Sequence, residues 1–220
     1  MNNSKIKISK EKNAIKGTDK NVQIQDFRLN ESDFNPLIGK CFKKYRCDSF
    51  EYTNGVTGIV GIYIDDKTFE LRNEQKSIQY FDSVDDIALW TFKEVNANDI
   101  HSFFEDTNQI DTPVNEIVKK ITLVNELQKV KISNEIYEML ITRAIIFHLE
   151  TKDIYFEKDN TAFSEEIEIK RGHKLKDEFP KKNDFFLNQW VNGISSSVET
   201  EFVLCRIVSY TVLLFYIQRS

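Results

Sequence analysis

Two stretches of this sequence, 85 positions apart, carry the same pattern, and that pattern limits what the chain can fold into. Residues 59–74 read IVGIYIDDKTFELRNE, and residues 144–159 read AIIFHLETKDIYFEKD. Each stretch has an apolar run, a short polar segment that contains a lysine, and a second run in which apolar and polar residues alternate. Alternation with a period of two is typical of a β-strand with one buried face. Both stretches are therefore predicted to be β-hairpins.

Corresponding positions in the two stretches agree in chemical type. The matched pairs are Ile64 and Leu149, Asp65 and Glu150, Lys67 and Lys152, Phe69 and Ile154, Leu71 and Phe156, and Glu74 and Asp159. Upstream, residues 37–42 resemble residues 117–121 at a spacing of 80, which requires an insertion of about five residues in the second copy. The sequence therefore predicts two related β-rich halves, with chance similarity between two hairpins as the alternative. Two such halves are expected to pack together, because either alone would leave strand edges exposed.

Further strands are predicted on either side of the hairpins. Asn54-Gly55 is a dipeptide typical of tight hairpin turns. Ile167 and Ile169 alternate with charged residues, which predicts another half-buried strand. The other strands are expected near residues 40–52, 77–81, 121–131 and 136–149.

Short helices are predicted at three places. Ser83, with an acidic residue three positions later, is a helix-start signal. We expect a helical turn there that leads into a strand over 87–95, with a strand alone as the alternative. A second short helix is expected over 98–104. Pro113 suits the first turn of a helix, and apolar residues at helical spacing extend the third prediction over 113–121.

The predicted organisation has four parts. Residues 1–24 are polar without periodicity and are expected to be a disordered basic tail. The first β-rich half spans 34–100, and the second spans 113–200. The apolar segment 201–220 is expected to pack on the second half as a core strand or helix. Its charge-free stretch, 207–217, has 11 residues, whereas a membrane span needs about 20, so a tail anchor is the lesser alternative, beside an aggregation-prone window.

These patterns predict a mainly β fold, of the β-rich α+β class, with a few short helices. The two similar halves are expected to form a sandwich or a barrel-like sheet. The sequence leaves open whether the halves make one domain or two.

The net charge of −5 conceals two opposite parts. Residues 1–20 contain six lysines against Glu11 and Asp19 and carry +4, so the remaining residues carry −9. An acidic body repels phosphate backbones, so nucleic-acid binding is not expected. The basic tail is expected to be solvated, with contact to an acidic partner or a membrane surface as the alternative.

Motifs for cofactors, metals and export are absent from the sequence. The chain has no GxGxxG, GxxxxGK[ST], HExxH or GxSxG motif, and its three cysteines and three histidines lack the spacing of a zinc site. We therefore expect no cofactor and no metal. No apolar region of signal-peptide length precedes residue 25, and no CxxC pair exists, so reduced thiols and a cytoplasmic location are predicted.

No residue is predicted to be catalytic. His148 lies inside an apolar run and is expected to be a hydrogen-bonded histidine of the sheet. Arg143 is expected at a strand edge or in an ion pair. Cys47 is expected to be structural, with a thiol paired to His148 or His173 as the alternative that nucleophilic catalysis would require. The remaining candidates, all expected to be structural or solvated, are Asp65-Asp66, Asp85-Asp86, Glu165-Glu166, Trp90, Trp190 and the basic cluster 171–174.

Three functions are compatible with this sequence. The leading hypothesis is a soluble, non-catalytic protein that binds another protein through its acidic β-rich body, as immunity or regulatory proteins do. The second is an enzyme with a site at the junction of the halves, and the third is a binder of a small apolar ligand. A deep pocket with several ionisable groups would favour the enzyme, and a deep apolar pocket would favour the ligand binder.

Overall fold

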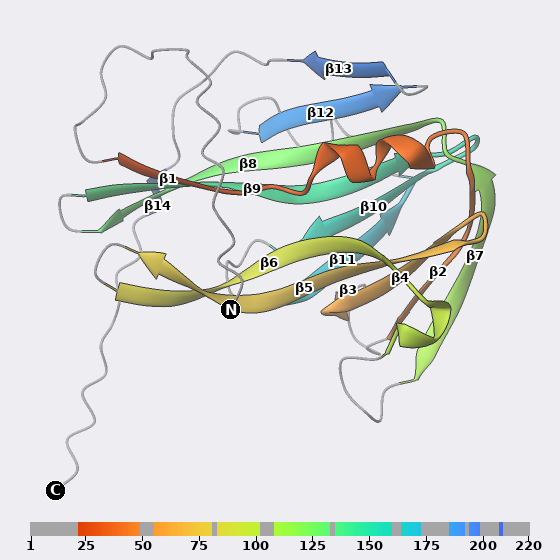
Figure 1. The fold of residues 1–220 in the computed structure, drawn as a ribbon, viewed down its shortest axis with the longest axis horizontal. Coiled ribbons are helices and arrows are strands. Elements are labelled where there is room, and N and C mark those ends of the chain that lie inside the picture. The colour runs from red at the N-terminus through yellow and green to blue at the C-terminus, as the bar shows by residue number, and fades with distance from the viewer. Residues whose placement is uncertain are drawn as a thin grey trace, which may run out of the picture.

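The computed structural model describes most of the chain between residues 22 and 208. The described ranges are 22–48, 55–80, 83–101, 108–132, 135–159, 164–172, 185–191, 194–198 and 207–208. Their strands form two sheets that face each other (Figure 1). The predicted mainly β class with a few short helical turns is confirmed.

Sheet B contains five strands in the order β6-β5-β4-β2-β7, and every neighbouring pair is antiparallel. Its strands are β2 (Cys41–Asp48), β4 (Ile59–Ile64), β5 (Lys67–Tyr80), β6 (Ser83–Val95) and β7 (Gln109–Ile117). The long β5–β6 hairpin ends this sheet, so β6 is an edge strand.

Sheet A contains nine strands, seven of them in the order β13-β12-β8-β9-β10-β11-β3. The short strands β1 and β14 add to it in parallel with β9 and β8. Its strands are β1 (Val22–Phe27), β3 (Gly55–Thr57), β8 (Lys120–Ile132), β9 (Glu135–His148), β10 (Asp153–Lys158), β11 (Glu166–Arg171), β12 (Phe185–Val191), β13 (Ile194–Val198) and β14 (Ile207–Val208).

The same strand order occurs in both sheets. The order β6-β5-β4-β2-β7 in sheet B corresponds to β11-β10-β9-β8-β12 in sheet A. In each, four strands follow one another as a meander, and a fifth returns to pair with the first. The shared order agrees with the predicted halves, but it is not by itself evidence of a common origin, and the duplication stays a prediction.

The chain passes from one sheet to the other at two corners, which join the two layers. Gly58 separates β3 in sheet A from β4 in sheet B; its φ of +66° is a conformation that favours glycine. Its N–H donates to Glu165, and its carbonyl accepts from Asn73. At the other corner, Val118 lies between β7 and β8 and exchanges backbone hydrogen bonds with the 39–40 segment. Corners of this kind are how stacked sheets close toward a barrel.

The main core lies between the two hairpins that the sequence predicted. Its inward-facing residues include Val60, Ile62, Ile64, Phe69 and Leu71 from sheet B, and Ile145, Phe147, Leu149, Ile154 and Phe156 from sheet A. Aromatic rings connect the layers edge to face, as in the Phe42–Phe147 pair with centroids 5.1 Å apart.

Two short 3-10 helices close the core beside β6. They are η1 (Glu31–Asp33) and η2 (Asn35–Leu37), and the Asn30 side chain caps the first by accepting from the Ser32 N–H. Between them, Phe34 is completely buried and stacks on Phe92 of β6. These two helices and β6 form the walls of the candidate site described below.

Two of the predicted helices are wrong. Residues 109–117 form the edge strand β7, in which Pro113 is tolerated because an edge strand can spare an N–H. Asn115, with a φ of +54°, lies where the β2–β7 register shifts, and it is incompatible with a helix. The predicted helical turn at Ser83 is also a strand, because thirteen successive pairings hold β6 against β5.

Other predictions lie partly or wholly outside the described residues. The third predicted helix begins as η3 (Ala97–Asp99), and residues 102–107 are not described. The tail 1–24 is described only from Val22, and the apolar segment 201–220 only at Ile207–Val208. Strands β2, β8, β9 and β11 lie where strands were predicted.

Candidate functional site

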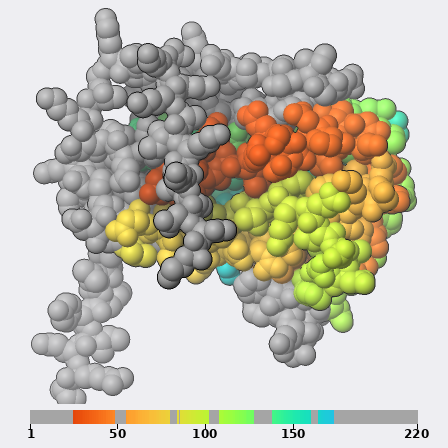
Figure 2. Space-filling view, viewed as in Figure 1, coloured from red at the N-terminus to blue at the C-terminus, as the bar shows by residue number. Residues whose placement is uncertain are grey.

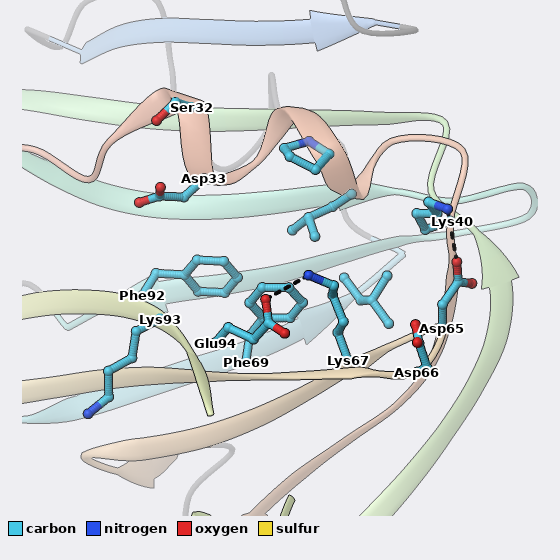
Figure 3. A pocket seen from close by; sticks show the side chains of 13 residues that line it. Ser32, Asp33, Lys40, Asp65, Asp66, Lys67, Phe69, Phe92, Lys93 and Glu94 are labelled. Carbon is cyan, nitrogen blue, oxygen red and sulfur yellow. Dashed lines mark hydrogen bonds and ion pairs between the residues drawn. The ribbon is translucent and has the colours of Figure 1, made fainter. Parts of the chain in front are cut away.

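A groove lies between the η1–η2 segment and the ends of β4, β5 and β6. It encloses about 530 Å³. Figure 2 shows the residues near 30–40, in orange-red, lying against the yellow-green residues of β6 and the segment after it. Figure 3 shows η1–η2 along one side of the groove and the strands of sheet B along the other.

The floor of the groove is apolar and aromatic. The rings of Phe69 and Phe92 are parallel within 4°, with centroids 5.1 Å apart. Phe34, which is buried and does not line the groove, also stacks on Phe92, with ring centroids 4.6 Å apart. Leu37 and Ile64 complete the apolar lining. Stacked rings of this kind hold a rigid apolar surface at little cost in side-chain entropy.

The rim of the groove is charged, and part of that charge is neutralised. Lys40 Nζ lies 3.4 Å from Asp65 Oδ2, and Lys67 Nζ lies 2.8 Å from Glu94 Oε2. Both pairs are about half exposed, so each contributes little to stability. Lys93, also on the rim, is paired with Glu70 outside the groove.

Two carboxylates on the rim have no such partner. Within the described part of the chain, no cation lies at ion-pair distance from Asp33 or Asp66. Asp33 projects from η1 and Asp66 from the β4–β5 turn, so they lie toward opposite ends of the groove (Figure 3). The groove therefore combines an aromatic floor with a net negative rim.

The β4–β5 turn that carries Asp66 is fixed by its neighbour. Asp65 adopts a φ of +51°, and its Oδ1 accepts from the Cys41 N–H at 2.9 Å. That hydrogen bond, with the nearby Lys40, lowers the pKa of Asp65. The turn is thus tied to β2, which places Asp66 at the end of the groove.

A second polar cluster lies on the outer face of sheet A. His148 Nε2 lies 2.9 Å from Thr122 Oγ1, and His148 Nδ1 lies 3.0 Å from Asp153 Oδ1. Burial lowers the pKa of His148; Asp153 opposes this shift and Lys120 adds to it. The order hydroxyl–imidazole–carboxylate is that of an acyl-transfer triad, but Thr122 has no exposed surface. The prediction of a hydrogen-bonded histidine in the sheet is confirmed.

Buried charges lie near the end of β10, and one of them reaches across to sheet B. Arg143 donates to the Asp159 carbonyl at 2.6 Å and lies 3.7 Å from Glu157, so the predicted pairing of this arginine is confirmed. Lys158, which is 2% exposed, donates from Nζ to the Ala88 carbonyl of β6. Burial lowers the pKa of Lys158 to about 8.

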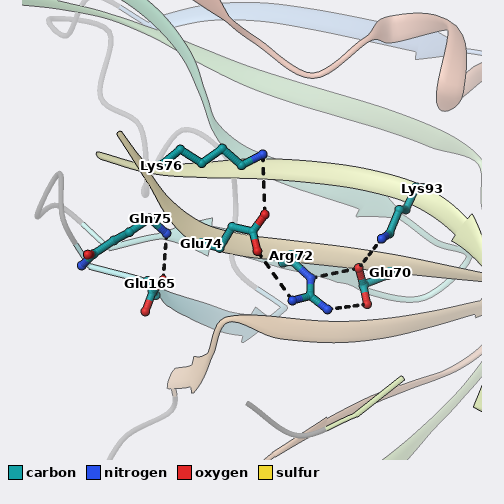
Figure 4. A network of polar contacts seen from close by, with 7 residues as sticks. All are labelled: Glu70, Arg72, Glu74, Gln75, Lys76, Lys93 and Glu165. Carbon is teal, nitrogen blue, oxygen red and sulfur yellow. Dashed lines mark hydrogen bonds and ion pairs between the residues drawn. The ribbon is translucent and has the colours of Figure 1, made fainter. Parts of the chain in front are cut away.

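The outer face of sheet B carries a chain of alternating charges (Figure 4). Glu70 accepts from both the Nε and the Nη2 of Arg72 at 3.0 Å and lies 3.1 Å from Lys93. Burial by itself would raise the pKa of Glu70, but the hydrogen bonds from Arg72 and Lys93 outweigh it and leave the pKa lowered. Glu74 continues the chain between Arg72 and Lys76.

The other sequence candidates do not form a site. Cys47 lies in the core on β2, where burial raises the pKa of its thiol to about 12, while His148 lies on the outer face of sheet A. Trp90 is a core residue. Asp65-Asp66 lies in the β4–β5 turn, and Asp85-Asp86 lies near the start of β6. In the part of the chain that the structure describes, no three potential metal ligands gather.

Sequence reasoning missed the groove, because residues 25–37 carry neither strand alternation nor a full helical pattern. The available signal was the spacing of Phe34 and Leu37, three positions apart on either side of Pro36, which puts both side chains on one side of a helical turn.

No family model, no curated protein and no solved structure matches this chain. Within the described ranges, none of the helices combines the length and the hydrophobicity that crossing a bilayer requires.

Proposed function

We propose that this protein is a non-catalytic binding protein and that the groove between η1–η2 and β6 receives a segment of a partner protein. The observation that carries the proposal is the combination of two features. One is the stacked aromatic floor of Phe69 and Phe92, and the other is a rim on which Asp33 and Asp66 have no ion-pair partner among the described residues. Aromatic anchors in a desolvated centre and charges around the edge are the arrangement of protein-binding sites.

The chemistry of the groove defines the partner segment. The apolar floor favours aliphatic or aromatic side chains, and the negative rim favours lysine or arginine at the two ends. Electrostatic complementarity also speeds association with a basic partner, in keeping with the −9 that the chain carries beyond residue 20. Neutralising a basic partner by occupying its surface is an immunity-like or regulatory role; this comparison is an analogy.

The test uses the tagged full-length protein and proteins captured from the source cell. The variant Asp33→Asn/Asp66→Asn removes the unpaired rim charges, and Asp99→Asn/Glu150→Gln is the matched control, since it removes two carboxylates outside the groove. We expect the captured partner to bind the groove variant roughly tenfold more weakly, mainly through slower association. Equal affinity of wild type and groove variant would overturn the proposal.

A small apolar ligand is the second candidate for this groove. Its volume of about 530 Å³ is in the range of ligand sites. Native mass spectrometry of the purified full-length protein distinguishes the two candidates: a bound small molecule that is lost in Phe92→Ala supports the ligand, whereas the rim variants bear on the protein partner.

A further inference from the structure

Among the described strands, β6 is the last of sheet B, and its outer edge lies beside the groove. Along a β-strand, the N–H and C=O of successive residues point to opposite sides. The N–H groups of Asn73 and Gln75 on β5 bond away from β6, to Gly58 and to the Glu165 side chain. On β6, Trp90 lies opposite Asn73, and Ala88 lies opposite Gln75. Because these pairs do not exchange backbone hydrogen bonds, the N–H and C=O of Ala88 and Trp90 point to the outer edge of β6.

The same alternation identifies the other β6 residues whose backbone groups point outward. The Ala88 carbonyl already accepts a hydrogen bond from Lys158. Continuing in steps of two, Trp90, Phe92 and Glu94 present their N–H and C=O outward. In the described residues, no backbone hydrogen bond to another segment reaches these three positions. Phe92 and Glu94 also line the groove, so the outer edge and the groove are one continuous surface.

The N-terminal sequence of this chain matches that surface. Residues 5–10 read KIKISK, in which isoleucine and lysine alternate with the period of a strand. On one side of such a strand, Ile6 and Ile8 suit the aromatic floor. Lys10 lies on the same side and suits the rim, where Asp33 and Asp66 have no ion-pair partner among the described residues. Eleven residues, 11–21, separate this stretch from β1 and can span roughly 36 Å when extended. The tail joins β1 at Val22, and the nine residues 22–30 put at most about 30 Å between that point and η1. The stretch can therefore reach the groove.

We propose that residues 5–10 of this chain add to sheet B as a strand along the outer edge of β6 and thereby occupy the groove. The backbone of the segment satisfies Trp90, Phe92 and Glu94, while its side chains alternate between the groove and solvent. A partner then has to displace the tail to bind. This regulatory consequence rests on the proposed function, but the docking itself does not, and it is tested without any partner.

The test measures amide hydrogen exchange by NMR in the full-length protein. In the wild type we expect slow exchange at Trp90, Phe92 and Glu94. The variant Ile6→Asn/Ile8→Asn removes the apolar face of the segment and should speed exchange at these amides at least tenfold. The matched control Ile15→Asn lies outside the alternating stretch and should leave them slow. The Thr91 amide, already paired with β5, should stay slow in every variant and so reports an intact hairpin.

Two results would overturn the proposal. Fast exchange at the three amides in the wild type would show an open edge. Slow exchange that persists in Ile6→Asn/Ile8→Asn would show that something else covers it, and a loss of protection on dilution would identify that cover as a second copy of the chain. Either result leaves the partner test with Asp33 and Asp66 unaffected, so the two proposals fail separately.

Discussion

The β4–β5 and β9–β10 hairpins have matching inner faces and different outer faces. Ile62 pairs with Phe69 in one, and Phe147 pairs with Ile154 in the other, which are the positions that the 85-residue spacing equates. All four side chains lie in the main core. The inner faces are alike because each has to bury an apolar surface against the other.

The outer faces differ because each sheet has different surroundings. Gly61 and Tyr63 in sheet B correspond to Ile146 and His148 in sheet A. The outer face around Glu70 carries ion pairs, whereas Ile146 lies in an apolar cluster with Val124, Ala144 and Tyr155. The comparison shows that alternation specifies one face of a strand, while the other face follows its tertiary contacts.

The largest expected effect tests whether the two inner faces share one core. Leu71 and Phe156 are equivalent positions without exposed surface. Leu71→Ala and Phe156→Ala should each lower the free energy of unfolding by about 3–4 kcal/mol, because each leaves a cavity. Urea unfolding followed by circular dichroism measures both, with Val84→Ala, which is 64% exposed, as the control. A small loss for Phe156→Ala beside a full loss for Leu71→Ala would separate the hairpins into two cores.

The second prediction concerns the ion pairs on the outer face of sheet B. Glu70→Gln should lower the free energy of unfolding at pH 7 by about 2 kcal/mol. The substitution removes the negative charge with which this buried side chain forms ion pairs to Arg72 and Lys93. Glu74→Gln, at a more exposed site, should change it by less than about 0.5 kcal/mol.

The pH dependence of that loss is a separate check. Since the pKa of Glu70 is lowered below 4.5 in the folded state, its contribution is present above pH 4.5 and is lost as the pH falls through the folded pKa. The difference between wild type and Glu70→Gln should shrink accordingly in acid. A difference that stays constant down to pH 3 would contradict the assignment.

The third prediction concerns two equivalent residues, Asn73 on β5 and Lys158 at the end of β10. Asn73 and Lys158 are equivalent, and both reach across to the other sheet, Asn73 by donating to the Ser164 carbonyl. Lys158→Met should raise the free energy of unfolding at pH 7 by about 1–2 kcal/mol. The pKa falls from 10.5 to about 8 on burial, which corresponds to about 3 kcal/mol, and losing the bond to Ala88 offsets part of the gain.

Alkaline unfolding experiments give the sign of the Lys158 effect independently. Between about pH 8 and 10.5 the unfolded chain binds more protons at this lysine than the folded protein does, so wild-type stability should rise through that window relative to Lys158→Met. Parallel curves for the two proteins would show that the pKa of Lys158 is not lowered in the folded protein.

The smallest effect concerns the outer face of sheet A. The pKa of His148 is lowered below 6.5 in the folded protein. As the pH falls, the imidazole is therefore protonated in the unfolded chain before it is protonated in the folded protein, and the free energy of unfolding should fall below pH 6.5. His148→Gln should remove this slope, with a change of about 1 kcal/mol or less. Unfolding between pH 7.5 and 5.5 measures it, and the exposed His101→Gln is the control. An unchanged slope in His148→Gln would assign it to another group.

The success of the sequence predictions depended on how local their signals were. The two hairpins were predictable because turn residues and alternation lie within about fifteen positions of one another. Pro113 and Ser83 were misread as helix starts, since pairing with β2 and β5 overrode the local preference. The groove was not predicted at all, because its walls come from residues 31–40 and from β4–β6, and only the fold brings them together.

The sequence by itself determined the β class, the two hairpins and their inward-facing residues, because burying alternate side chains requires no information beyond the strand itself. Tertiary structure alone decided which outer faces are covered, where strands change sheets, and that Asp33 and Asp66 lie on one rim. The physical reason is that those features depend on contacts between distant segments, whose chain-entropy cost is met only when the whole sandwich assembles.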